Sequence, residues 1–149
     1  MGELLDTDVA SQIIFRGEFP AAKKDMGDTG RRWLGADFAG LGVDNNTYAV
    51  IDEYGMLYWE KINQQNSFEK SNKLRTLFYE WHCRSGNVDN TGGYGSGALD
   101  LIEGNPNLVI DGVNFADEAF DKKLFPQART EMYLELAQDI RNGFWVCEE

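Results

Sequence analysis

Hydrophobic and polar positions along the middle of the chain follow first a strand period and then a helix period. Apolar residues dominate three short segments bounded by glycine, asparagine and other turn residues, which predicts strands at 33–38, 47–51 and 56–62. After them, apolar residues recur at helical spacing over 68–84, and Ser67 is expected to cap this helix with Lys70 at the third helical position. Three strands in a row are therefore followed by a helix.

The second half of the chain alternates strands with helices. The pattern predicts a short strand at 87–89, a short helix at 98–102, a strand at 108–113, a helix at 126–142 and a last strand at 144–147. The helix at 126–142 is expected to bury Met132, Leu136 and Ile140 on one face.

This order of elements predicts an α/β fold. An antiparallel meander beside parallel strands joined by helical crossovers is a ribonuclease H-like mixed five-stranded sheet flanked by helices. The first thirty residues show no sustained period, so we expect a lead-in or linker segment at 1–31 and one domain at 32–149.

Composition narrows the class of protein. A chain of 149 residues with 42% hydrophobic content is enough for one layered core. There is no apolar run of the ~20 residues that a membrane helix needs, and no signal-peptide pattern, so we expect a cytoplasmic protein without a membrane partner. Cys83 and Cys147 lack metal-binding spacing and are expected to be free thiols.

The charge argues against a protein that grips nucleic acid through a broad basic face. Acidic residues outnumber basic ones 25 to 14, which gives a net charge of −11. Divalent metal ions on clustered carboxylates would reverse the local sign where a phosphate lies, and a basic partner or further domain could supply affinity.

Two aspartates stand at strand ends, each followed by glycines. In the predicted sheet the first and fourth strands are neighbours, so Asp37 and Asp89 come together at one edge. Such a pair can hold two Mg²⁺ or Mn²⁺ ions for phosphodiester hydrolysis, and the glycines would let backbone and substrate approach closely. The alternative is that both aspartates simply begin turns, as aspartate often does.

Four segments, in order, resemble the nuclease domain of the tailed-phage terminase large subunit. The segment GADFAGLGVDNNT at 35–47 is similar to the family's GxDxAxxGxDxT, with the threonine one place late. VDNTGGYGSG at 88–97 resembles VDxTGxGxG with one extra residue, and VNF at 113–115 with RTEMY at 129–133 resembles a third stretch. FRGEFP at 15–20 is similar to the segment that joins the family's ATPase and nuclease domains.

The resemblance implies a metal-dependent endonuclease that cuts concatemeric double-stranded DNA in the host cytoplasm. It also implies a phage or prophage protein that acts with a terminase ATPase domain, a small subunit and a portal. Such terminases carry a third acid in a later D-x-A-D-A helix, which this sequence lacks.

We expect truncation to account for the missing acid. The final helix could instead lie on another polypeptide, or an acid of the 126–142 helix such as Glu131 could be the substitute ligand. Glu131, Glu135 and Asp139 lie four positions apart and so share one helix face. A charged face exposed to solvent explains this spacing more simply than a metal ligand does.

Other charged residues are weaker candidates. Asp44 can orient the metal loop, or it can cap the hairpin. Arg129 is a candidate phosphate contact, with a plain surface arginine as the alternative, and Lys122 and Lys123 form the basic pair before its helix.

Two rival functions remain. Another ribonuclease H-like nuclease, of the resolvase or transposase type, would use the same carboxylate chemistry on a different substrate. A non-catalytic terminase remnant would keep the fold and bind protein partners, and its acidity would suit basic ones. The missing third acid favours the remnant.

Overall fold

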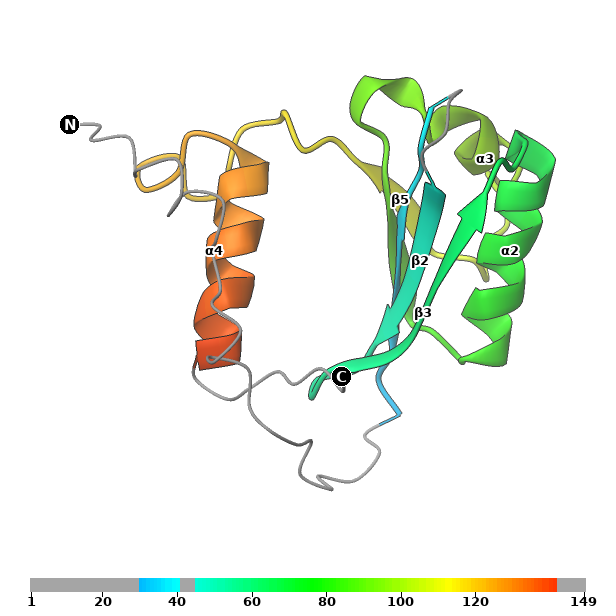
Figure 1. Cartoon of the computed structure of the whole chain (residues 1–149), viewed down its shortest axis with the longest axis horizontal. Coiled ribbons are helices and arrows are strands. Elements are labelled where there is room, and N and C mark those ends of the chain that lie inside the picture. Colours follow the sequence, from blue (N-terminus) through cyan, green and yellow to red (C-terminus); the bar gives the residue numbers. More distant parts are fainter. Residues whose placement is uncertain (1–29, 41–44, 142–149) are drawn as a thin grey trace.

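A five-stranded mixed sheet forms the centre of the molecule (Figure 1). The computed structural model describes residues 30–40 and 45–141. Its strands are β1 (Trp33–Asp37), β2 (Asn45–Ile51), β3 (Met56–Asn63), β4 (Ser85–Asp89) and β5 (Ile110–Val113). They lie in the order β3-β2-β1-β4-β5. The first three pair antiparallel, whereas β4 is parallel to both β1 and β5, so the predicted mixed sheet is confirmed.

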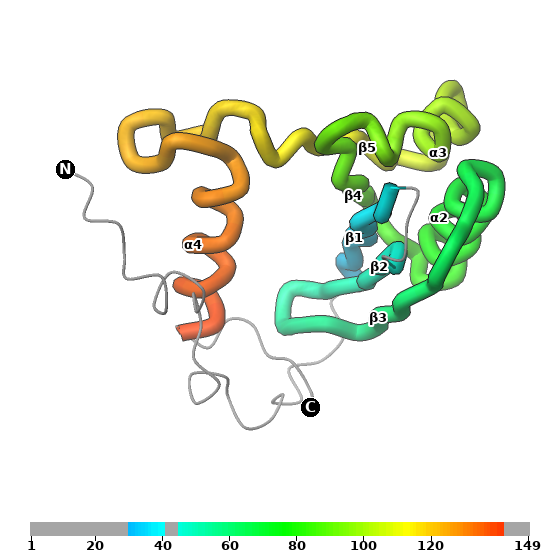
Figure 2. The backbone as a smooth tube through the Cα atoms, turned by 45° about the horizontal axis from the view of Figure 1, so that its top comes forward, coloured from blue at the N-terminus to red at the C-terminus, as the bar shows by residue number. Residues whose placement is uncertain are grey.

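Two helices cover one face of this sheet. Figure 2 shows α2 (Ser67–Glu80) and α3 (Ser96–Asp100) on the same side of β1 and β2. Helix α4 (Ala128–Arg141) stands on the opposite side. Within the described residues, no helix is both long enough and apolar enough to cross a membrane.

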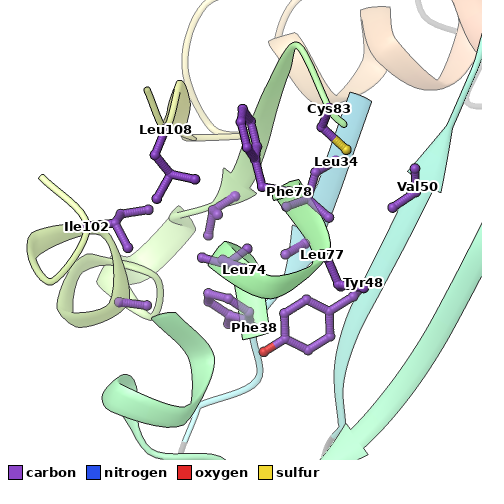
Figure 3. Packing of buried hydrophobic residues seen from close by; sticks show 13 residues of the cluster. Leu34, Phe38, Tyr48, Val50, Leu74, Leu77, Phe78, Cys83, Ile102 and Leu108 are labelled. Carbon is purple, nitrogen blue, oxygen red and sulfur yellow. The ribbon is translucent and has the colours of Figure 1, made fainter. Parts of the chain in front are cut away.

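The core lies between the sheet and α2. Alternate residues of β1 and β2 point inward, as the period of a strand requires, and Tyr48 and Val50 are fully buried. Figure 3 shows Leu74 and Leu77 of α2 packed against these strand residues. Val88 of β4 completes the centre of the cluster at 0% exposure. Neighbouring strands β1 and β4 thus both contribute buried residues, Leu34 and Val88, to this core.

The predicted cap and the predicted end of the helix at 68–84, which is α2, are wrong. Asn66, not Ser67, is the cap: its side chain accepts from the Glu69 N–H at 2.9 Å, and its own N–H donates to the Glu69 carboxylate at 2.8 Å. The helix ends at Glu80 instead of residue 84 because the backbone turns left-handed at His82, φ +52°, and the Cys83 N–H bonds back to Phe78.

Other predicted elements differ in extent by a few residues; for example, the strand predicted at 47–51 begins at Asn45 and the helix predicted at 126–142 begins at Ala128. The strand predicted at 87–89 begins earlier, at Ser85. The strand predicted at 108–113 begins only at Ile110, because the Ile110 N–H bonds to the Leu108 carbonyl in a tight turn. The short helix lies at Ser96–Asp100 instead of 98–102. The strand predicted at 144–147 and nearly all of the lead-in at 1–31 lie outside the described residues.

The predicted apolar face of α4 is also wrong. Of the expected residues only Ile140 is buried, while Met132 and Leu136 are exposed. The inward residues are instead Glu131, Ala137 and Ile140. Periodicity misplaced the face because a glutamate, held by loop backbone, takes an inward position that a hydrophobic pattern cannot reveal.

Replacing a core leucine tests this packing. Leu74→Ala removes a fully buried side chain between α2 and the sheet, and we expect the free energy of unfolding to fall by about 2–5 kcal/mol. Thr76→Ala, at an exposed position of the same helix, should change it by less than about 0.5 kcal/mol. Urea denaturation measures both, and equal effects would contradict the described core.

Candidate metal centre

The last residues of β1 and β4 carry the two carboxylates predicted to bind metal. In the parallel register Asp37 stands directly opposite Asp89. Neighbouring strands lie ~4.8 Å apart, so the two side chains leave the sheet edge side by side. The structure therefore brings together, from distant parts of the sequence, the pair that the sequence singled out.

Backbone after β4 holds Asp89 from one side. Its Oδ1 accepts a hydrogen bond from the Thr91 N–H at 2.8 Å, and the Thr91 hydroxyl oxygen accepts one from the Phe115 N–H at 2.8 Å. Because Phe115 follows β5, these two bonds tie the loop after β4 to the loop after β5. One carboxylate oxygen of Asp89 has no part in this Thr91 bond and is a candidate ligand atom.

The glycine run after Asp89 packs tightly against the strand. Gly92 and Gly93 adopt left-handed φ values of +74° and +81°, which favour glycine. A Cβ at Gly95 would lie 2.8 Å from Val88 Cγ1 and 3.0 Å from the Asp89 carbonyl oxygen. The space that glycine leaves at position 95 is thus filled by the strand end that carries Asp89, and not kept open for a substrate.

Backbone after β1 is held just beyond Asp37. The Ala39 N–H donates to Asn46 Oδ1 at 3.2 Å, and Lys70 Nζ donates to the Ala39 carbonyl at 3.2 Å. Asn46 and Lys70 are both buried. Sequence reasoning missed both residues, although Lys70 lies four positions before Leu74 on the face that the helical period assigns to the core.

Burial raises the pKa of the Asp37 carboxyl above its ordinary value. The negative charge of Asp89 raises this pKa further, and the positive charge of Arg129 lowers it in part. Two acids that repel each other at one edge are the arrangement that a divalent cation relieves. The donor set therefore fits Mg²⁺ or Mn²⁺, which prefer carboxylate oxygens.

A hollow of about 370 Å³ opens beside the two aspartates. Its walls come from the face of the sheet opposite α2, with Trp33 and Ile51, and from Phe115 and Met132 on the α4 side. Space thus exists next to the carboxylates for a ligand larger than a metal ion.

Arg129 is the basic candidate that the structure brings to this centre. It lies in the first turn of α4, with its guanidinium carbon 5.8 Å from the centre of the Phe115 ring, and its charge acts on Asp37. Lys122 is exposed and paired with Glu118, and Lys123 is exposed on the same loop. No contact of the described residues places either lysine beside the aspartates.

Glu131 does not join the two aspartates, which corrects its proposed role as a substitute ligand. Its carboxylate is 7% exposed and accepts hydrogen bonds from the Phe120 N–H at 2.6 Å and the Asp121 N–H at 2.8 Å. Both oxygens thus fasten the loop before α4. Across residues 30–40 and 45–141, no three acidic, histidine or cysteine side chains are grouped as a metal site. Asp44 lies outside the described residues.

Comparison with known proteins identifies the fold. No protein-family profile and no curated protein sequence matches the chain. Among solved structures, the nuclease domain of the large terminase subunit of bacterial virus Sf6 matches with a TM-score of 0.64 and 14% identity, over 76% of this chain and 55% of that one. A mutant of the same domain with manganese gives 0.69 and 15%, over 89% and 65%. The large terminase nuclease of thermophilic phage G20c gives 0.61 and 16%, over 77% and 56%.

The fold is therefore the ribonuclease H-like fold of large terminase nuclease domains, as the order of elements and the resemblance to that family predicted. The chain spans a little over half the length of most of these solved domains.

Neutralising Asp37 should stabilise the metal-free protein. A carboxyl whose pKa is raised by folding contributes stability that is present below about pH 3.8 and is lost as pH rises through the folded pKa. Asp37→Asn removes this loss, so at pH 7 in EDTA it should melt at a higher temperature than wild type, and the difference should shrink toward pH 4.

Asp100→Asn, an exposed acid at the end of α3, is the control for net charge. If it stabilises the protein as much as Asp37→Asn does, the effect is not specific to the aspartate pair.

Adding one methyl group at Gly95, next to the end of β4 that carries Asp89, should destabilise the protein. Gly95→Ala places a Cβ against Val88 and the Asp89 carbonyl, and we expect the free energy of unfolding to fall by about 1–3 kcal/mol. Gly35→Ala, in β1 with no atom within 4 Å of the added Cβ, should be tolerated. Thermal denaturation compares the two, and equal loss would contradict this packing.

Proposed function

We propose that this chain is the nuclease part of a viral DNA-packaging terminase, a metal-dependent endonuclease that cuts concatemeric double-stranded DNA. The observation that carries the proposal is the register pairing of Asp37 with Asp89 at the edge of a sheet with the terminase nuclease fold. Domains of this fold have been solved with bound magnesium and with manganese, which supports the choice of metal.

Asp37 and Asp89 would hold two Mg²⁺ or Mn²⁺ ions through their carboxylate oxygens. When bound, the ions would supply Lewis acidity and positive charge at the scissile phosphate. The chain's own groups do the rest: Thr91 orients Asp89, and Arg129 faces the same centre with a cation that can contact a phosphate. Asp44, Lys122 and Lys123 remain weaker candidates for the metal loop and for DNA contacts.

The net charge of −11 argues against a broad basic DNA-binding face, so we expect bound metal ions and partners to supply much of the DNA affinity. The proposal therefore includes partners: a terminase ATPase domain joined through the lead-in at 1–31, a small subunit and a portal, acting in the cytoplasm of the host cell. The domain proper would be 32–149.

A second function is favoured by one observation. The described residues provide two acids where the family uses three, and one missing ligand weakens metal placement, on which phosphodiester cleavage depends. A terminase remnant that binds basic protein partners would keep this fold without activity. A resolvase or transposase-type nuclease has no comparable support, since the solved neighbours are terminase nucleases.

Plasmid nicking separates these functions. Purified chain incubated with supercoiled plasmid and Mn²⁺ should produce nicked circles, and EDTA, Asp37→Ala and Asp89→Ala should each abolish them. Asp100→Ala removes an exposed acid at the end of α3, which does not line the hollow beside the pair, and should nick at the wild-type rate. Nicking that persists in both aspartate variants would assign it to a contaminant and contradict the proposal; no nicking by any form would favour the binding-only remnant.

A further inference from the structure

A buried lysine lies beneath the backbone that follows Asp37. Lys70, in the first turns of α2, is 8% exposed and shares the inward face of that helix with Leu74 and Leu77. Lysine is almost never buried without a partner, because removing an ammonium group from water is costly. The contacts of its ammonium group therefore have to account for the buried position of Lys70.

Within residues 30–40 and 45–141, the hydrogen bond and the ring contact of the ammonium group are both with the segment after β1. Its Nζ donates to the Ala39 carbonyl at 3.2 Å and lies 4.9 Å from the centre of the Phe38 ring. Among the described residues, no carboxylate pairs with it. Burial lowers the pKa of Lys70, because removing the ammonium group from water disfavours its charged form.

The two residues after Asp37 are thus held from several sides. The ring of Phe38 packs edge-on against that of Tyr48, with 5.6 Å between the ring centres. The same Phe38 ring also makes a cation-π contact with Lys70. The Ala39 N–H is bonded to buried Asn46, while its carbonyl is bonded to Lys70. With both peptide groups of Ala39 fixed, the direction in which the chain leaves β1 is fixed as well.

We propose that Lys70 is a positioning residue, which holds the Ala39 carbonyl from beneath and thereby keeps Asp37 oriented toward Asp89. This inference rests on the proposed function, because its consequence is metal affinity. In this role Lys70 would bind neither the metal nor the substrate. It acts on the ligand through two residues of backbone, much as outer-shell partners elsewhere orient the residues that bind a metal.

A pair of lysine variants on one helix tests the proposal. Lys70→Met keeps the length of the side chain and removes the ammonium; Lys73→Met, less than one turn along α2, removes an ion pair with Glu60 on the β3 side. Mn²⁺ binding to the full chain is measured by calorimetry. We expect Lys70→Met to bind Mn²⁺ about 10-fold more weakly than wild type and Lys73→Met to bind like wild type, even where both lower the melting temperature.

A second readout needs no metal. Hydrogen exchange of the Ala39 amide, followed by NMR under conditions where all forms are folded, should be faster in Lys70→Met and unchanged in Lys73→Met. If Lys70→Met does not fold, Lys70→Gln replaces it: its shorter, uncharged amide cannot reach as the ammonium does, so the same losses are expected.

The outcomes separate the two proposals. If wild type binds no Mn²⁺, the proposed function fails, and the Ala39 amide alone decides whether Lys70 holds this backbone. If wild type binds and Lys70→Met binds equally well, the positioning role is overturned and the metal site stands. Equal weakening by Lys73→Met would also overturn it, because general destabilisation would then explain the loss.

Discussion

Parallel pairing of β1 with β4 is the constraint on which the rest of this structure depends. It places Asp37 opposite Asp89, and it does so only because α2 crosses one face of the sheet and returns the chain beside its starting strand. The core residues Leu34, Val88 and Leu74 stabilise that return. The free energy of hydrophobic burial thus offsets the repulsion between two like charges at the ends of β1 and β4.

The repulsion explains how the surroundings of the pair are built. Each aspartate is followed by backbone that is fastened to a second element: Ala39 to Asn46 and Lys70, and Thr91 to Phe115. Loose loops would let the carboxylates move apart and relieve their charge. Fastened loops keep the charges together, which makes the metal-free site unfavourable and favours a divalent cation.

Much of the fold followed from the sequence because its signals are local. Strand periods at β1 to β3 and helical spacing along α2 located these elements, and the order of elements gave the sheet. The end of α2 was missed because a left-handed His82 is a backbone choice that hydrophobic spacing does not record. The inward face of α4 was missed because Glu131 is buried against loop N–H groups, a tertiary interaction with no sequence period.

The site divides in the same way. Asp37 and Asp89 could be proposed from their places at strand ends. Lys70 and Asn46 were missed because both bind the backbone of Ala39, and hydrophobic spacing does not record contacts of a side chain with backbone. We propose that the two aspartates together form the site where the two divalent cations bind. A crystal soaked in Mn²⁺ and measured at the manganese absorption edge tests it most directly. We expect anomalous density in contact with both carboxylates; density confined to other acidic residues, or none at the pair, would contradict the claim.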